Sequence, residues 1–346
     1  MLKSYKTYIY NNLSRIRKNI YIDLNGNLEN TFFLASTPRS GSTWIAESIE
    51  RLTKSRLIFE PFHGKVNSGL PKVTPLYLRF DATYSEYQKK IDEILRGNIR
   101  SEYSDKINKK IIVKNRLIKA IHANLMLPWL VNNYPEVKYT YLIRHPFPTA
   151  LSLTSMAKKI GPEDYTRQLE YLHQEELLKD FLVDKTDLIK SAKTRFEQYI
   201  LRWCIEQIVP LTLLKKESKV LIIFYENACM NKAQTIIRIG KHLDINIPEK
   251  YKNEIISSMN QPSATAFLGD KKKPSEFSQK ISKYEKDKKV DNLKLLIDWR
   301  PSLDKAISQS EIEYGLSALK AFSLDRLYTD DLLPHVDENQ VFDIFS

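Results

Sequence analysis

Residues 32–45 read Phe-Phe-Leu-Ala-Ser-Thr-Pro-Arg-Ser-Gly-Ser-Thr-Trp-Ile, and this stretch decides the fold. Its apolar start predicts a buried strand, the polar residues around Gly41 predict a tight turn, and a helix is expected from about Thr43. Backbone N–H groups in such a turn, together with the positive end of a helix, bind phosphate-like anions. Arg39 adds a fixed positive charge, and Ser40, Ser42 and Thr43 add hydroxyl donors. The stretch therefore predicts an anion-binding loop, and a strand–turn–helix corner with a polar cap is the alternative.

This loop differs from the phosphate loop of nucleotide kinases. That loop carries a lysine that contacts the terminal phosphates and a hydroxyl residue that holds Mg²⁺. Here no lysine follows Gly41, and the turn contains a single glycine. The sequence favours transfer of an anion without a metal ion, so we expect no metal site.

The bulk composition is that of a globular protein with a preference for anions. Of the 346 residues, 42% are hydrophobic and 28% are charged. The net charge of +12 favours nucleic acid, a phosphate-rich cofactor, acidic glycans or an anionic membrane face as partners. The two cysteines can build neither a disulfide framework nor a zinc cluster, which favours a reducing compartment. No run of about 18 apolar residues is present, so we expect no transmembrane segment.

Short apolar runs alternate with longer stretches of helical periodicity. The runs predicted to be strands are Thr31–Ala35, Leu57–Phe59, Lys110–Val113, Lys138–Ile143 and Lys219–Phe224. The alternation predicts an α/β fold, a P-loop-like three-layer sandwich in which helices flank a central parallel sheet. Ligands of such sheets bind beyond the carboxyl ends of the strands. Residues 155–215 read as a helical insertion, which we expect to cap the site.

We expect three parts along the chain. Residues 1–29 form a basic N-terminal leader, residues 30–270 form the main domain with its insertion, and residues 271–346 form a C-terminal helical or lid segment of the same domain. Aromatic and basic residues are mixed in the leader. We interpret it as packed or frayed, and a peripheral contact with a membrane surface is the alternative.

Two motifs resemble those of a known family. Residues 38–44, Pro-Arg-Ser-Gly-Ser-Thr-Trp, resemble the 5′-phosphosulfate loop of the sulfotransferases that use 3′-phosphoadenosine-5′-phosphosulfate (PAPS). Residues 141–146, Tyr-Leu-Ile-Arg-His-Pro, are similar to the family's 3′-phosphate site, in which an arginine at a strand end and a serine on the next helix bind one phosphate. Arg144 and Ser152 are the matching residues. The resemblance extends over roughly residues 30–270.

The resemblance also implies residues that contact the adenine end of the nucleotide. Tyr225, at the end of the last predicted strand, matches a nucleotide-contacting tyrosine of the family, and Trp44 matches an adenine-stacking tryptophan. Thr265 and Phe267 match a Thr-x-Phe contact. Plain core packing is the alternative for the aromatic residues. The family's lysine-rich phosphate segment has no clean counterpart, and Lys271, Lys272 and Lys273 are its candidates.

Catalysis of sulfuryl transfer needs positive charge at the leaving group and a base for the acceptor proton. The resemblance assigns Arg39 to the leaving-group charge and Lys114 to the sulfuryl oxygens. Arg116 stands where the cytosolic members have a catalytic histidine, and an arginine cannot accept a proton at neutral pH. The carbohydrate and tyrosylprotein type uses a glutamate instead, and Glu60 is in the matching place.

Glu60 has apolar neighbours, Phe59 and Phe62, which predict a raised pKa suited to proton abstraction. A structural ion pair of Glu60 with Arg39 or Arg56 is the alternative. His63 is the second candidate base and His122 the third.

The sequence thus predicts an enzyme that transfers the sulfuryl group of PAPS to a hydroxyl or amine acceptor and releases PAP. The acceptor is expected to be a carbohydrate or another small or lipid-linked hydroxyl compound. A nucleotide-dependent kinase and a non-catalytic polyanion-binding module are the alternatives. We expect a cytoplasmic protein with no nucleic-acid partner. Peripheral contact with a membrane is compatible with this expectation.

Overall fold

The structure is a computed structural model. It describes residues 22–64, 66, 69–70, 75–108, 110–160, 168–261, 263–265, 296, 299–329 and 333–345. Some predictions concern residues outside this set, namely the leader up to residue 21, Phe267 and the candidate lysines 271–273. These stay predictions.

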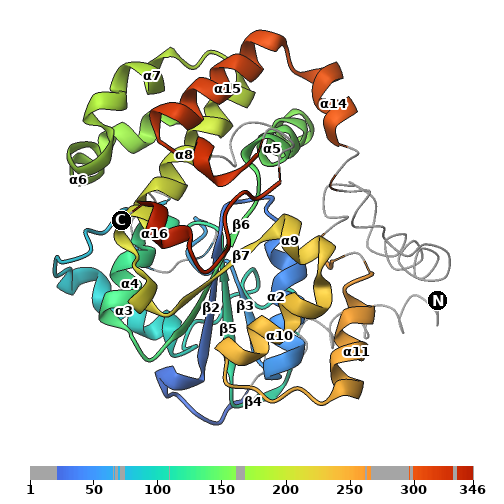
Figure 1. The fold of residues 1–346 in the computed structure, drawn as a ribbon. Helices are drawn as coiled ribbons and strands as arrows, with labels where there is room; N and C mark the ends of the chain where they lie inside the picture. Colours follow the sequence, from blue (N-terminus) through green and yellow to red (C-terminus); the bar gives the residue numbers. More distant parts are fainter. Residues whose placement is uncertain are drawn as a thin grey trace, which may run out of the picture.

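A five-stranded parallel sheet with the strand order β3-β5-β2-β6-β7 forms the centre of the fold (Figure 1). Its strands are β2 (Thr31–Ser36), β3 (Arg56–Phe59), β5 (Arg116–Ala120), β6 (Lys138–Ile143) and β7 (Val220–Phe224). In register, Leu34 of the central strand β2 lies between Lys119 of β5 and Thr140 of β6. Because all five strands run in the same direction, their carboxyl ends meet at one edge of the sheet. The predicted parallel sheet is confirmed.

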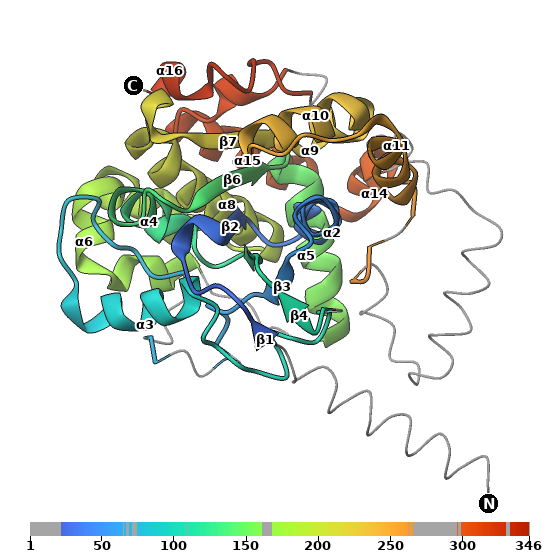
Figure 2. The same ribbon diagram turned by 90° about the horizontal axis from the view of Figure 1, so that it is seen from below.

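Helices cover both faces of the sheet because successive strand residues point to opposite sides and both sides are apolar. In β2, Phe33 and Ala35 pack into one core, and Phe32 and Leu34 pack into the other. One face is covered by α2 (Ser42–Thr53), α9 (Tyr225–Met230), α10 (Lys232–His242) and α11 (Glu249–Ser258). The other is covered by α4 (Leu127–Asn133), α5 (Pro146–Ile160) and α8 (Arg195–Leu213). Figures 1 and 2 show the sheet between these helices, which is the predicted three-layer sandwich.

Two strands beside the main sheet correct the prediction for residues 110–113. Only Ile112–Val113 (β4) is extended, and it pairs in parallel with β1 (Ile22–Asp23) in a separate two-stranded sheet (Figure 2). The strand of the central sheet is β5, which begins at Arg116. This arginine is fully buried at the amino end of β5, where its Nε lies 3.1 Å from Asp23 Oδ2 and its Nη1 lies 3.0 Å from Thr31 Oγ1.

The segment from α5 to α8 is helical over its described residues, as predicted. Helix α8 of this segment belongs to a layer of the sandwich, because it packs directly on α5 and shares a core with the sheet. The expected cap over the site stays a prediction. The hydroxyl of Tyr141, in the middle of β6, donates to Gln207 Oε1 of α8 at 2.6 Å. Thr194 and Glu197 form a capping box that fixes the start of α8. Trp203 of α8 is almost fully buried.

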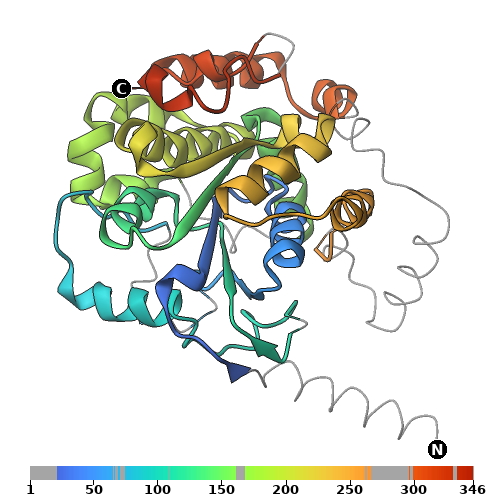
Figure 3. The same ribbon diagram turned by 60° about the horizontal axis from the view of Figure 1, so that its bottom comes forward.

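The C-terminal helices gather on one side of the fold, where they are coloured red in Figure 3. These are α14 (Trp299–Ala306), α15 (Gln309–Ala321) and α16 (Val341–Phe345). Helices α15 and α16 pack on α8, and Glu338 Oε1 accepts the N–H of Phe224 at 2.5 Å. None of the described helices is both long enough and apolar enough to cross a bilayer.

The remaining elements are short. They are η1 (Leu28–Asn30), α3 (Ser85–Leu95), η2 (Asn124–Met126), η4 (Gln168–His173), α6 (Glu175–Leu177), η5 (Leu178–Leu182), η6 (Val183–Lys185), α7 (Thr186–Ser191), η7 (Lys216–Ser218) and η8 (Asp325–Leu327).

Candidate active site

The loop between β2 and α2 has the geometry of an anion cradle. Arg39 and Gly41 both have a positive φ, 66° and 80°, on either side of Ser40. Ser40 is fully buried, and its Oγ lies 2.6 Å from Thr37 Oγ1, which holds the turn from inside. Alternation of left-handed with ordinary residues turns successive N–H groups toward one point, and α2 begins there at Ser42. The loop, helix and glycine are where the sequence predicted them.

Gly41 is required by its surroundings as well as by its φ. A Cβ atom at this position would lie 2.4 Å from a ring carbon of Tyr225. Gly41→Ala is therefore expected to lower the melting temperature, because a left-handed alanine costs about 1–2 kcal/mol before the clash is counted. It should also weaken PAP binding about tenfold or more, because the clash with Tyr225 displaces the N–H groups of the loop. Thermal unfolding with and without PAP checks this result.

The matched control is Gly26→Ala, because a Cβ atom there meets no atom within 4 Å. This variant should stay within about 0.5 kcal/mol of the parent protein and bind PAP equally well. Equal PAP affinity in Gly41→Ala and Gly26→Ala would contradict the assignment of the loop.

The Arg144 and Ser152 pair lies directly beside this loop. Arg144 follows the last residue of β6, and Ser152 is on α5. The Nε of Arg39 donates to Ser152 Oγ at 2.9 Å, and Arg144 Nη1 donates to the carbonyl of Arg39 at 3.0 Å. The Arg144 guanidinium also lies over the ring of Tyr225, 4.4 Å from its centroid. The two motifs that the sequence predicted to act together are thus one cluster at the carboxyl edge of the sheet.

Two hydrogen bonds position Arg144. The carbonyl of Arg144 accepts the indole N–H of Trp203 at 3.0 Å, and the next residue, His145, donates its backbone N–H to Glu226 Oε1 at 2.9 Å. Burial raises the pKa of Glu226 to about 7. The sequence analysis did not identify Trp203 and Glu226 as positioning residues, because each reaches the end of β6 from a helix distant in the sequence.

The residues predicted to contact adenine have different surroundings. Trp44 is a buried residue in the first turn of α2, and its indole N–H donates to the carbonyl of Met259 at 2.9 Å. Its ring meets Tyr225 edge to face at 5.8 Å between centroids. Next to Thr265, the backbone N–H of Ala264 donates to Glu47 Oε1 of α2 at 2.8 Å. The structure therefore places Tyr225 against the loop and Trp44 beside Tyr225 as a core residue, whereas the contact next to Thr265 is with α2.

Glu60 lies at the carboxyl end of β3 in a buried ion pair. Its Oε1 is 2.5 Å from Lys119 Nζ, and its Oε2 accepts the hydroxyl of Tyr103 at 2.9 Å. Burial raises the pKa of Glu60, but the charge of Lys119 and the hydrogen bonds from Lys119 and Tyr103 outweigh it, so the pKa lies below the usual 4.5. The predicted raised pKa is wrong. The alternative of an ion pair holds for Glu60, but with Lys119 as its partner; Arg56 instead binds Asp105, with its Nε 2.9 Å from Oδ1.

Lys114 is not at this site. It is exposed and lies two residues before β5, at the amino end of the sheet, whereas the site is at the carboxyl end. Lys119, near the end of β5, is the lysine that meets Glu60. Burial lowers the pKa of Lys119, Glu60 raises it, and the nearby Arg39 lowers it further, so the pKa lies below 10.5. In the sequence, the apolar pair Leu117 and Ile118 could have indicated that the strand of the central sheet is β5, and hence that Lys119 lies near its end.

Two histidines extend the cluster away from the loop. The ring of His63 lies 4.9 Å from that of Tyr103 and 5.3 Å from that of His122. Burial, and then the positive charges of Arg202, His63 and Lys119, hold the pKa of His122 well below 6.5. His122 is therefore neutral at physiological pH.

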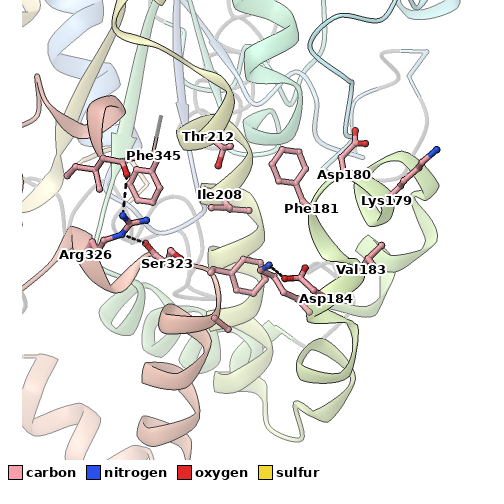
Figure 4. A pocket seen from close by; sticks show the side chains of 14 residues that line it. Lys179, Asp180, Phe181, Val183, Asp184, Ile208, Thr212, Ser323, Arg326 and Phe345 are labelled. Carbon is pink, nitrogen blue, oxygen red and sulfur yellow. Dashed lines mark hydrogen bonds and ion pairs between the residues drawn. The ribbon is translucent and has the colours of Figure 1, made fainter.

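A separate pocket of about 520 Å³ lies between η5, η6, α8 and the C-terminal helices (Figure 4). Two of its cations are bonded within it. Lys185 binds Asp184 at 2.7 Å, and Arg326 donates to the carbonyls of Ser323 and Ile344. None of the residues that line it belongs to the loop, to the Arg144 cluster or to the ion pair of Glu60.

Comparison with known proteins identifies the class of enzyme. The family model described as the sulfotransferase domain matches residues 29–312. The chain belongs to the sulfotransferase family, and the PAPS-dependent sulfotransferase predicted from the two motifs is confirmed.

Solved structures of similar fold are distant in sequence. Mouse sulfotransferase SULT7A1 complexed with PAP is 16% identical, with 94% of this chain and 91% of that chain covered and a TM-score of 0.42. The sulfotransferase domain from the curacin biosynthetic pathway is 15% identical, with 86% and 99% covered and a TM-score of 0.40. Retinol dehydratase in complex with androsterone and inactive cofactor PAP is 16% identical, with 88% and 83% covered and a TM-score of 0.38. A search of curated proteins gave no match.

Proposed function

We propose that the enzyme transfers the sulfuryl group of PAPS to a hydroxyl acceptor, a carbohydrate in our expectation, with Glu60 as the base. The observation that carries this proposal is the meeting of two phosphate-binding motifs with a carboxylate–lysine pair at one sheet edge. Lys119 lies beside Leu34 of β2, the strand that leads into the loop, and the charge of Arg39 helps to lower the pKa of Lys119. An amine acceptor would need the same groups.

In this proposal the loop and the Arg144 cluster hold the two ends of the nucleotide. The N–H groups around Gly41 hold the 5′-phosphosulfate, and Arg144 with Ser152 holds the 3′-phosphate. Tyr225 fits this arrangement because its ring packs against both Gly41 and Arg144. Trp44 packs against the ring of Tyr225 from the core and holds it in place. Thr265 and, outside the described residues, Phe267 complete the expected nucleotide contacts.

The reaction is an in-line displacement at sulfur. The acceptor oxygen forms a bond to sulfur, the bond from sulfur to the bridging phosphate oxygen breaks, and PAP leaves with the electron pair. The acceptor proton passes to the Glu60 carboxylate, which is ionised because its pKa is lowered. Arg39 and Lys119 stabilise the negative charge that develops on the bridging and sulfuryl oxygens. Lys119 takes the role that the sequence assigned to Lys114.

PAP is expected to raise the melting temperature without added metal, because a ligand that binds only the folded protein stabilises it by mass action. At a concentration about 100 times its Kd, the gain is roughly 2.7 kcal/mol. Differential scanning fluorimetry with PAP, AMP and ATP checks the result. A shift with ATP that equals the shift with PAP would count against recognition of the 3′-phosphate.

A further inference from the structure

His145 joins the two residues to which the proposed function assigns the 3′-phosphate. It follows Arg144 at the end of β6, and α5, which carries Ser152, begins at the next residue. The carbonyl of His145 accepts the hydroxyl hydrogen bond of Thr149, in the first turn of α5, at 2.9 Å. A shift of His145 would therefore move Arg144 and the start of α5 together.

The buried imidazole ring of His145 is surrounded by aromatic rings. The ring of Phe147 lies 5.3 Å from it and the ring of Tyr328 lies 4.6 Å from it, measured between centroids, and both meet it edge to face. The indole of Trp299 lies nearly parallel to it, at 6.0 Å and an interplanar angle of 24°. Burial lowers the pKa of His145 to about 3, with nearby arginines as the lesser cause, so the ring is neutral. Packing, and not charge, therefore holds this ring.

Two of these rings come from the C-terminal part of the chain. Trp299 begins α14, which packs against α5, and Tyr328 follows η8, beyond residue 312, where the match to the sulfotransferase domain ends. Tyr328 also meets Phe224, the last residue of β7, edge to face at 5.7 Å. Glu338 accepts the N–H of Phe224 and forms an ion pair with Arg238 of α10. The C-terminal part is thus fastened to the end of β7, next to β6 in the sheet.

The ring of Tyr328 makes its contacts, and its hydroxyl adds none that is seen. The residue is half-buried, and its buried hydroxyl has no hydrogen-bond partner among the residues that the structure describes. Edge-to-face aromatic pairs stabilise a structure beyond the area that they bury. A phenylalanine at this position would therefore keep the contacts with His145 and Phe224, and a leucine would lose both aromatic pairs.

We propose that Tyr328 and Trp299 are positioning residues for the nucleotide, which act by holding His145 in place. Through His145 they set Arg144 and Ser152 for the 3′-phosphate. This inference rests on the proposed function, in which that pair binds that phosphate. Binding groups must be held within about 0.5 Å of their productive positions, and the side chains packed behind them supply this precision. The C-terminal part thereby contributes to the selection of PAP over nucleotides that lack a 3′-phosphate.

The test uses PAP and AMP, two nucleotides that differ only in the 3′-phosphate. Calorimetric titration of the full chain measures the dissociation constant of each, and the ratio of the two constants reports recognition of the 3′-phosphate alone. Tyr328→Leu is expected to weaken PAP binding about tenfold, the scale of one misaligned hydrogen bond to a charged group, and AMP binding less than about twofold. Tyr328→Phe keeps the ring and should bind both nucleotides as the parent protein does.

Phe322→Leu is the matched control for lost packing. Phe322 is a buried aromatic residue of the same C-terminal part, but it lines the separate pocket, where Lys185 lies over its ring. This variant should lower the melting temperature and leave the ratio of the two dissociation constants unchanged. If Tyr328→Leu fails to fold, Trp299→Leu carries the test, because Trp299 is only half-buried. It should weaken PAP binding more than AMP binding as well.

Two results would overturn the inference. The first is an unchanged ratio of the PAP and AMP dissociation constants in Tyr328→Leu, or in Trp299→Leu where that variant carries the test. The second is an equal loss of PAP affinity in Tyr328→Phe and Tyr328→Leu, because the hydroxyl and not the ring would then be responsible. A parent protein that binds PAP no more tightly than AMP would instead contradict the 3′-phosphate site, and with it the proposed function.

Discussion

Replacing Glu60 by glutamine lowers turnover about 100-fold or more and leaves PAP affinity unchanged, if Glu60 is the base. Glutamine has nearly the same shape as glutamate and can still accept the hydrogen bond of Tyr103, but it cannot take up the acceptor proton. Loss of a general base typically lowers rates by about 10²–10⁴-fold. Initial rates with PAPS and calorimetric titration with PAP measure the two effects separately.

The pH dependence distinguishes Glu60 from His63. Because the pKa of Glu60 lies below 4.5, the carboxylate stays ionised as the pH falls to that value, and kcat/KM should lose activity only below about pH 4.5. Lys119 has a pKa below 10.5, so the alkaline loss should begin below that pH. A histidine base would move the acidic loss to near pH 6.5. Near-normal turnover in Glu60→Gln, with a large loss in His63→Gln, would transfer the role to His63.

Replacing Lys119 by methionine is expected to destabilise the protein by about 3–5 kcal/mol and to lower turnover about 100-fold or more. The Glu60 carboxylate would remain buried, with the hydrogen bond of Tyr103 and the weaker effect of the Lys106 charge to stabilise it, so its pKa would rise and the group would bind a proton. Positive charge at the sulfuryl group would be lost as well. Urea denaturation and initial rates measure the two losses.

Two controls accompany Lys119→Met. Lys114→Met should leave stability and turnover nearly unchanged, since Lys114 is exposed at the opposite end of the sheet. The double variant Glu60→Gln with Lys119→Met should recover much of the stability but none of the turnover, because it leaves no buried charge unpaired. A larger loss of turnover in Lys114→Met than in Lys119→Met would contradict the role proposed for Lys119 and return it to Lys114.

The sheet was predictable where apolar residues run without interruption. Strand β2 has such a run, and in β6 only Thr140 interrupts it after Lys138; the structure ends each strand within one residue of the prediction. Strand β5 was missed because Arg116 and Lys119 interrupt it with charges. Their neutralising partners, Asp23 and Glu60, are far away in the sequence, and only the fold brings them together.

In the site, too, features set by adjacent residues were predictable and features set by distant segments were not. The cradle at Gly41 is a local strand–turn–helix, so adjacent residues specify it completely. The pKa of Glu60 depends on Lys119 and Tyr103, which approach from other segments, and its apolar neighbours in sequence led to the wrong direction.

The contact between Gly41, Tyr225 and Arg144 has a kinetic consequence. Three segments from different parts of the chain hold one another, so the cradle is already ordered before the nucleotide arrives, and binding forfeits little conformational entropy. With no loop rearrangement to wait for, the association rate should follow diffusion and the attraction between a basic protein and an anionic ligand. It should therefore decrease steeply as ionic strength rises, while the dissociation rate changes much less.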